Sequence, residues 1–440
     1  MASRRSNSIV LLLAISMIIG TFLRISLLAI YPLLALFIAA FFKFRASSSM
    51  LLAAMFVGIS FIFSLYPNIF LKYKLLSLYY MLPLLLLLFA QPAVEKDNQP
   101  GSLNIFFRCL TFVGLINNII GLFQVIKNPQ SDDSFMGLYT DFSVSLNGLV
   151  ILNTLLFYYY FVLYIYEKKP ISLLTSLFFL GCSILGFYGA GLVICLAAFI
   201  LGFFRFELKS FFKVAFITII SLLVVYQAMT FIKPQTLEYN IANIKKMIDF
   251  DVHNGPRKLT SFYNYATAYP KNAKDFLLGS GPGSFNSRTA FMIGSPSYFT
   301  SIPQIKDKEQ PYYFKHYAYS LWNESNTSQA LYQDGFRNQP FSSILAFLGE
   351  YGLLFTLVFA VLYYLYYSRV ARLYRMRHND PEARVYFRFF KICFILLPLL
   401  FLIDNYFEYP EIMLLLTLSI KFSHAGLLSV NNKEREIMQK

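Results

Sequence analysis

Charged residues are scarce in this chain. They make up 14% of its 440 residues, against about 25% in a typical soluble domain. Hydrophobic residues make up 57% and are gathered into many long apolar runs. This composition excludes an ordinary soluble protein and predicts an integral membrane protein.

Cysteine and tryptophan are also rare. The four cysteines all lie within apolar runs: Cys109, Cys182, Cys195 and Cys393. A structural disulfide in a hydrophilic loop is therefore excluded. No cysteine–histidine pair has the spacing of a metal site, and we expect neither a metal nor a cofactor.

The sequence lacks a small-residue cleavage site after its first apolar run, although Arg4 and Arg5 precede that run as in a signal peptide. We therefore expect an uncleaved first span. An internal repeat is also lacking, and a hydrophilic loop at 233–342 divides the expected spans into nine and three. Many transporters have symmetric halves, so this division disfavours a carrier.

Long apolar runs are what the sequence has in abundance. A helix needs about 20 apolar residues to cross a bilayer. We therefore expect an all-α polytopic membrane protein. Spans one to nine lie in 1–232, and a large, mainly helical loop follows at 233–342. Spans ten to twelve, with a basic loop and a basic tail, lie in 343–440. The twelve expected spans are 8–22, 25–42, 49–66, 75–90, 103–126, 146–166, 170–187, 190–204, 211–232, 343–367, 389–404 and 409–423.

The distribution of Lys and Arg predicts the orientation. With the N-terminus in the cytoplasm, twenty cations fall in cytoplasmic segments, and only Arg24, Lys72, Lys74 and Lys127 fall in short outer loops. Positive residues are retained inside, so we expect both termini in the cytoplasm and the long loop outside. The arginine cluster at 369–388 either binds nucleic acid or anchors the topology on anionic lipid. Its position favours the lipid, and no nucleic acid is expected.

The long loop carries twelve cations and eight acids, an excess that suits an anionic ligand. Four apolar residues with helical spacing predict a helix in the membrane interface: Leu237, Ile241, Ile244 and Ile248. A second helix is expected to begin at Pro256 and to end before Pro270, with Arg257 in its first turn. The helix dipole does not favour a cation there, which hints at a function for Arg257.

A glycine-rich turn follows, in which Gly279, Gly281 and Gly283 alternate with other residues. Alternating glycines permit positive φ and a close backbone approach. The turn is either a phosphate-binding nest or a purely structural turn. It lacks the lysine of a P-loop and is no nucleotide motif.

The order of these motifs resembles the O-antigen ligase and O-antigen polymerase superfamily of bacterial inner-membrane glycosyltransferases. Arg257 is followed by an aromatic-rich helix, by Pro270 and by a Leu-Leu-Gly-x-Gly-x-Gly-x-Phe stretch at 277–285. The segment 342–353 resembles the family's re-entrant segment, with Glu350 in its Glu-x-Gly. Asn147 resembles the Asn that opens the sixth span in the family.

The resemblance implies a reaction at the periplasmic face of the bilayer of the inner membrane. The donor would be a glycan on undecaprenyl pyrophosphate, the acceptor a sugar hydroxyl, and a chain-length regulator protein a partner. Fixed cations would stabilise the departing pyrophosphate, and arginine meets phosphate oxygens bidentately. We expect catalytic roles for Arg257, Arg337 and Glu350, and substrate binding by Arg288, Gly279, Gly281, Gly283, Asn147 and His316. The alternative for the arginines is that they are solvated loop cations.

The reaction also needs a base for the acceptor proton. Glu350 lies in an apolar segment, where a charge is often functional, but a helix-packing contact is the alternative. Other candidate bases are His253, His316, Glu324 and Asp334. We expect a solvated turn, rather than a cleft lining or a cation site, for Asp404, Glu408 and Glu411. Aromatic residues of the loop either stack on sugars or form a small loop core: Tyr298, Phe299, Tyr312, Tyr313, Tyr317, Tyr319 and Trp322.

Some positions depart from the family pattern. Phe341 stands where the ligases have a His, and Tyr188-Gly189 stands where many members have Ser-Arg. The missing His favours a polymerase of lipid-linked repeat units over a ligase that transfers glycan to lipid A core. Glycan transfer to protein and, from a different class, a carrier or flippase for lipid-linked sugars remain as alternatives.

Overall fold

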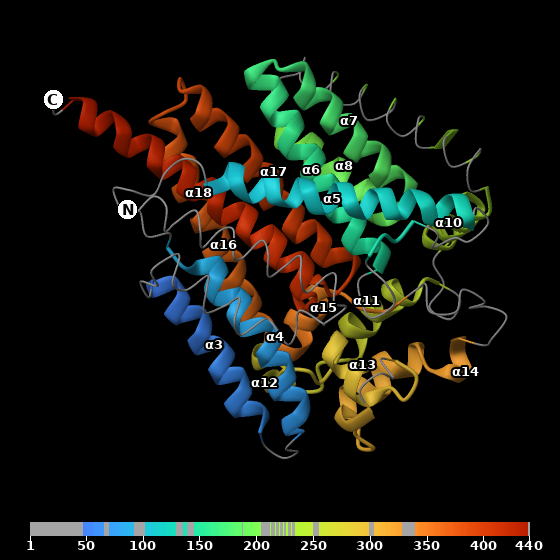
Figure 1. The fold of residues 1–440 in the computed structure, drawn as a ribbon. Coiled ribbons are helices and arrows are strands. Elements are labelled where there is room, and N and C mark those ends of the chain that lie inside the picture. The colour runs from blue at the N-terminus through green and yellow to red at the C-terminus, as the bar shows by residue number, and fades with distance from the viewer. Residues whose placement is uncertain are drawn as a thin grey trace.

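The computed structural model describes residues 47–65, 70–91, 102–128, 135–138, 145–186, 188–203, 234–249, 255–298, 303–327 and 339–438, together with single residues between 212 and 230. Within these residues the secondary structure is helical throughout (Figure 1). The expected first two spans and most of the ninth lie outside the described residues, as do Arg337, His253 and Asp334.

Helices with membrane-crossing composition form most of the molecule. Six helical stretches of the described residues are long and apolar enough to cross a membrane, and three shorter helices are equally apolar. This confirms an all-helical membrane protein, while the count of twelve stays a prediction. The helices before the loop are α3 (Ser48–Ser64), α4 (Leu71–Phe89), α5 (Ser102–Lys127), α6 (Ser145–Glu167), α7 (Pro170–Leu185) and α8 (Gly189–Phe203). Those after it are α15 (Ser343–Ala346), η5 (Phe347–Tyr351), α16 (Gly352–Arg375), α17 (Pro381–Ile403), η6 (Tyr406–Glu408) and α18 (Pro410–Met438).

The loop is also helical where the structure describes it. A helix at Pro234–Ile248 (α10) confirms the first helix expected there, and one at Arg257–Thr267 (α11) confirms the second. Pro256 precedes α11 as its N-cap, so Arg257 is the first helical residue. The remaining elements are α12 (Ala273–Leu278), α13 (Arg288–Gly294), η1 (Pro303–Ile305), η2 (Phe314–Ala318), η3 (Tyr319–Leu321) and α14 (Glu324–Thr327).

Two helices begin several residues before the expected spans, and a side-chain cap explains the start of one of them, α17. Asp380 accepts hydrogen bonds from the N–H groups of Glu382 (2.7 Å) and Ala383 (3.3 Å). With Pro381 as the first helical residue, this cap starts α17 eight residues before the expected 389. The placement of Lys74 in an outer loop was wrong, because α4 already begins at Leu71 and leaves Lys74 2% exposed.

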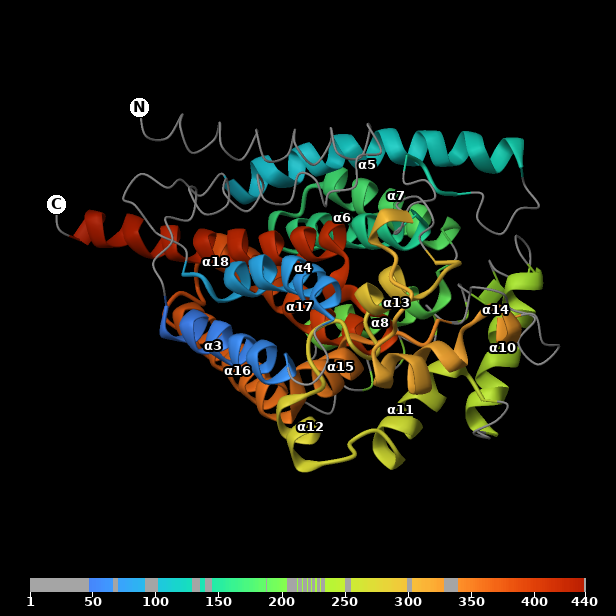
Figure 2. The same ribbon diagram turned by 90° about the horizontal axis from the view of Figure 1, so that it is seen from below.

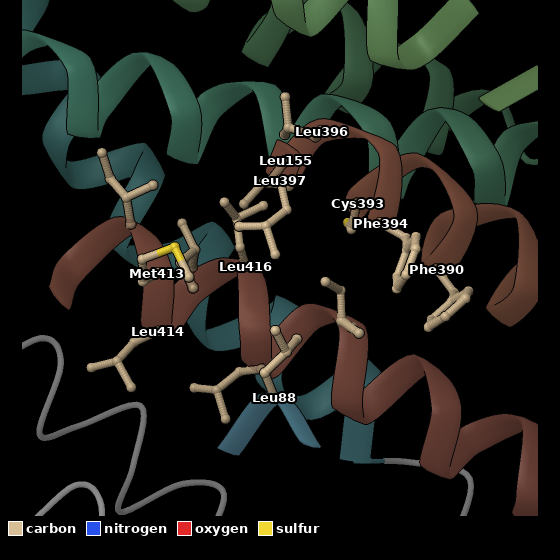
Figure 3. Close-up of a cluster of buried hydrophobic side chains, with 14 of the residues drawn as sticks. Leu88, Leu155, Phe390, Cys393, Phe394, Leu396, Leu397, Met413, Leu414 and Leu416 are labelled. Carbon is tan, nitrogen blue, oxygen red and sulfur yellow. The ribbon is translucent and has the colours of Figure 1, made fainter. Parts of the chain in front are cut away.

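The core is centred on α18. The apolar window of α18 is 89% buried inside the protein, whereas that of α5 is 33% buried. Figure 3 shows the middle of this core, where Leu397 of α17 and Leu416 of α18 lie near Leu155 of α6 and Leu88 of α4. A helix enclosed to this extent is central to the bundle, even though α18 also carries buried polar residues such as Lys421 and His424.

One face of α5 remains uncovered. It carries exposed apolar residues at helical spacing: Phe112, Leu115, Ile119, Phe123 and Ile126. Their exposed fractions run from 38% to 76%. Such a stripe is unusual on a soluble protein and is typical of a helix that faces lipid.

The two ends of the bundle differ in composition. Figures 1 and 2 place the loop helices α11, α12, α13 and α14 together at one end, and the C-terminal end of α18 at the other. The first of these is called the loop end below and the second the far end. Helix α16 begins at the loop end and carries Arg369, Arg372 and Arg375 toward the far end.

Candidate functional site

The glycine turn lies at the loop end and has the backbone that its sequence predicts. Gly279, Gly281 and Gly283 have φ values of +78°, +105° and +70°. A Cβ at Gly279 would lie 2.3 Å from the carbonyl oxygen of Glu350, and one at Gly283 would lie 2.5 Å from the carbonyl oxygen of Tyr73. The close approach that these glycines permit is therefore to the protein's own backbone.

Glu350 binds this turn with its side chain. The N–H of Gly283 donates to Oε2 (2.6 Å) and the N–H of Phe285 donates to Oε1 (2.9 Å). The N–H of Gly281 donates to the Glu350 carbonyl oxygen at 2.9 Å. Glu350 is fully buried. Two N–H groups of the turn thus bind a carboxyl group that belongs to the chain itself, which favours the packing interpretation of Glu350.

The segment that carries Glu350 is a broken helix. Four α-helical residues in α15 lead into the π-helical turn η5, and Gly352 with φ +82° then opens α16. A Cβ at Gly352 would lie 2.3 Å from the carbonyl oxygen of Leu277. π-helical turns are rare and are frequent at functional sites. Here the turn presents the backbone of 349–350 to the glycine turn.

The expected solvated turn at Asp404 and Glu408 was wrong, because both carboxylates are buried, with 7% and 4% exposure. Glu408 accepts four hydrogen bonds: from the N–H (2.8 Å) and hydroxyl (3.0 Å) of Thr289, from Ser77 (3.1 Å) and from Asn405 (3.0 Å). Burial raises the pKa of Glu408 above its usual value, although these hydrogen bonds act in the opposite direction.

Two cations of the loop act on the charge of Asp404. Its Oδ1 accepts from the N–H of Asn405 at 2.6 Å. Burial raises the pKa of Asp404, and the charges of Lys258 and Arg288 oppose that increase. The Lys258 ammonium donates to the carbonyl oxygen of Ile403, which ties the first turn of α11 to the end of α17. The connection between α17 and α18 is thus where separate loop segments meet.

Arg288 is buried against aromatic rings. It is 4% exposed, its Nε donates to the hydroxyl of Tyr298 at 2.7 Å, and its guanidinium lies 3.7 Å from the centroid of the Tyr409 ring. This is a cation–π geometry. The alternative of a solvated loop cation is wrong for Arg288.

Arg257 is likewise no solvated cation. It is fully buried at the start of α11, beside Lys258, and α11 packs against α15. We call the following buried and part-buried residues the loop-end cluster: Arg257, Lys258, Arg288, Tyr298, Glu350, Asp404 and Glu408. Ser77 donates to Glu408 (3.1 Å) and contacts the hydroxyl of Tyr351 (2.8 Å), the residue that follows Glu350.

The aromatic residues of the loop form a packed core for the most part. Phe341 is fully buried, with its ring centroid 4.6 Å from that of Phe291 and 5.3 Å from that of Trp322. Tyr312 is exposed, 44%, and its ring centroid lies 4.4 Å from that of His316. Phe341 therefore occupies a position in the aromatic core of the loop.

Several expected site residues lie away from the cluster. His316 and Glu324 are exposed on the loop. Asn147 is half-buried in the first turn of α6, and no contact joins it to the cluster among the described residues. Tyr188, at the departure from the family pattern, accepts a hydrogen bond from the hydroxyl of Tyr406 in η6 at 2.8 Å.

Two residues that sequence reasoning missed complete the site: Lys258 acts on the charge of Asp404, and Thr289 donates to Glu408. Tyr298, which was expected only as a loop aromatic, accepts a hydrogen bond from Arg288. The side-chain nitrogen of Asn286 is buried and has no hydrogen-bond partner within the described part of the chain, while its oxygen accepts from the N–H of Ser342 at 3.0 Å. An acid directly after an apolar segment, as at Asp404, was the available signal.

Among the described residues no group of three or more His, Cys, Asp or Glu side chains is placed to hold a metal ion. Comparison with models of protein families and with curated proteins gives no match to this chain.

Proposed function

We propose that the protein is a membrane glycosyltransferase that polymerises repeat units carried on undecaprenyl pyrophosphate, with its site at the loop end. The observation that carries the proposal is the burial of Arg257 and Arg288 where the loop meets the helix ends. A buried guanidinium acts in a medium of low dielectric, where its effect on developing negative charge is larger than in water.

The reaction divides into tasks for which the cluster has suitable groups. The acceptor hydroxyl attacks the anomeric carbon of the donor, the bond from that carbon to the pyrophosphate oxygen breaks, and a base takes the hydroxyl proton. Arg257 and Arg288 would stabilise the departing pyrophosphate, with Arg337 as a further expected cation. Asp404 is the candidate base, since the charges of Lys258 and Arg288 favour its ionised form and its carboxylate accepts a hydrogen bond from its neighbour Asn405.

Glu350 takes a positioning role in this proposal. Its carboxylate holds Gly283 and Phe285, and its backbone holds Gly281. Phe341 supports a polymerase over a ligase, because a buried phenylalanine offers no titratable group at the position of the ligase His. The experiment below distinguishes a polymerase from an enzyme that transfers glycan to protein and from a carrier.

The experiment is the lipopolysaccharide gel pattern of a deletion strain and of the strain complemented with this chain. A polymerase predicts loss of the ladder with one repeat unit still attached to the core. Bare core with accumulated lipid-linked polymer would show a ligase instead. Lipid-linked single repeats trapped on the cytoplasmic side would show a carrier, and a normal ladder with unglycosylated protein would show transfer to protein.

A further inference from the structure

A cavity of about 210 Å³ lies at the far end of the bundle, away from the loop-end cluster. It lies between the first turn of α3, the end of α4, the second half of α16, and α18. Its lining includes Ser49, Tyr366, Arg369 and His424. At about 30 Å³ for each water in the liquid, the volume is that of several water molecules.

Two basic residues lie at this far-end cavity, Arg369 in its lining and Lys421 next to its lining residue Ala90. Lys421 is 1% exposed, and its ammonium donates to the carbonyl oxygen of Ala90, a lining residue. The same ammonium lies 4.4 Å from the centroid of the Tyr366 ring, and the hydroxyl of Tyr366 is 3.2 Å from Nδ1 of His424. No carboxylate of the described residues forms an ion pair with Lys421 or Arg369. Of the two, only Lys421 is buried, because Arg369 is exposed. Burying an ammonium group without a counter-charge is costly, and an anion in the cavity would offset that cost.

The outer part of the lining is apolar and exposed. Leu52 of α3 and Leu365 of α16 line the cavity with 37% and 54% exposure. Leu365 belongs to a stretch that is long and apolar enough to cross a membrane, and Arg369 stands one helical turn further along it. The site therefore combines cations at the end of a span with an apolar opening toward the surface of the bundle.

We propose that the far-end cavity binds an anionic phospholipid, with its phosphate at Arg369 and Lys421 and its acyl chains along Leu52 and Leu365. Basic pockets between membrane helices bind such head groups. Arginine is suited to the phosphate because of its bidentate donors. A free phosphate ion would bind the same cations, but it has no apolar part to contact the apolar opening. The proposal does not depend on the activity at the loop end.

Native mass spectrometry of the full chain in detergent tests this, with phosphatidylglycerol, phosphatidylcholine and inorganic phosphate as separate probes. We expect phosphatidylglycerol to be retained preferentially. Arg369→Gln should weaken its retention by about tenfold or more, the effect of one lost charge-assisted hydrogen bond. Arg372→Gln is the matched control, because Arg372 is an exposed arginine of the same helix that does not line the cavity.

A second variant, Ser49→Phe, fills the cavity and leaves both cations in place. It should abolish the preferential retention while the melting temperature stays near that of the wild type. Equal weakening by the Arg369 and Arg372 variants, equal retention of phosphatidylcholine, or full retention by Ser49→Phe would each overturn the proposal. Retention of inorganic phosphate as strong as that of phosphatidylglycerol would overturn the lipid assignment. It would indicate a site for a small anion instead.

Discussion

The two ends of the bundle bury charge in different ways. At the loop end, acidic and basic residues lie in one cluster, and Glu408 alone accepts four hydrogen bonds from the protein. At the far end, Arg369 lines a cavity and Lys421 donates to its lining residue Ala90, and neither forms an ion pair with a carboxylate among the described residues. A network that is satisfied internally fixes a geometry, whereas charge of one sign around a cavity favours an external ligand.

The difference gives a way to sort the residues of the loop-end cluster. A residue that holds the network together should lower stability and activity together when it is changed. A residue that serves the donor should lower activity and leave stability near that of the wild type. The predictions that follow apply this criterion to single positions, beginning with the largest expected effect.

Arg257 should be a residue that serves the donor, so that its loss lowers activity but not stability. Arg257→Ala is expected to abolish polymer formation, and Arg257→Lys, which keeps the charge but loses the planar fork, should retain very little. Removing one preorganised donor to a developing oxyanion costs about 10²–10³ in rate. The measurement is the polymer ladder at matched expression, with the melting temperature of the Lys variant in detergent as the stability readout.

The matched control for Arg257 is Lys274→Ala, since Lys274 is an exposed cation of the same loop. Its ladder should be that of the wild type. A full ladder from Arg257→Lys at normal expression would refute the role of Arg257 at the pyrophosphate.

Gly279 should be a residue that holds the network together, so that its substitution lowers stability and activity together. Gly279→Ala places a Cβ 2.3 Å from a backbone oxygen at φ +78°, so both the contact and the conformation are strained. The left-handed conformation alone costs about 1–2 kcal/mol for a residue with a Cβ. Melting temperature and polymer formation should fall together. If activity is lost while the melting temperature is unchanged, the turn contacts the ligand rather than the fold.

Gly58 provides the control for that substitution. It lies within α3, and a Cβ added there would meet nothing within 4 Å. Gly58→Ala should leave activity unchanged and stabilise the helix by up to about 1 kcal/mol.

Much of the loop end could be predicted from the sequence, because its signals are local. The positive φ values of the glycine turn and the position of Arg257 in the first turn of a helix depend on residues a few positions apart. The burial of Asp404 and Glu408 could not be predicted in this way. Glu408 is held by Thr289, which lies 119 positions earlier, and without that contact an acidic residue after an apolar segment has the pattern of a solvated turn.

The same limit applies to Glu350 and to the far end. An acid inside an apolar segment indicates a function or a packing contact, and only the N–H groups of Gly283 and Phe285 distinguish the two. The arginines of 369–388 indicate an anchor on anionic lipid. The packing of α16 against α18 places Arg369 in the lining of a cavity near Lys421. No local sequence pattern predicts this packing.

Glu350→Gln tests the positioning role. The amide keeps one acceptor oxygen but replaces the other with a donor that faces an N–H group. Leaving a buried N–H group without an acceptor costs about 1–3 kcal/mol, so we expect a clear fall in melting temperature and a proportionate fall in activity. A variant that melts like the wild type but makes no polymer would instead identify Glu350 as a catalytic base.

The smallest expected effect is a pH dependence of stability from Asp404 and Glu408. Burial raises the pKa of both carboxyls in the folded protein, whereas in the unfolded chain they titrate near about 4. Between the unfolded and the raised folded values, the folded state binds more protons, so stability falls as the pH rises through that window. The melting temperature in detergent should therefore increase as the pH is lowered from neutral toward about 5.

Glu408→Gln should flatten this dependence, because one of the two groups no longer titrates. The comparison is of slopes, so a general loss of stability in the variant does not affect it. Glu309→Gln, at an exposed position of the same loop, should leave the slope unchanged. Equal slopes in all the proteins would mean that the two acids remain ionised in the folded state. In that case the hydrogen bonds from Thr289, Ser77 and Asn405 outweigh the cost of burial, and the loop-end cluster is a fixed anionic centre that balances Lys258 and Arg288.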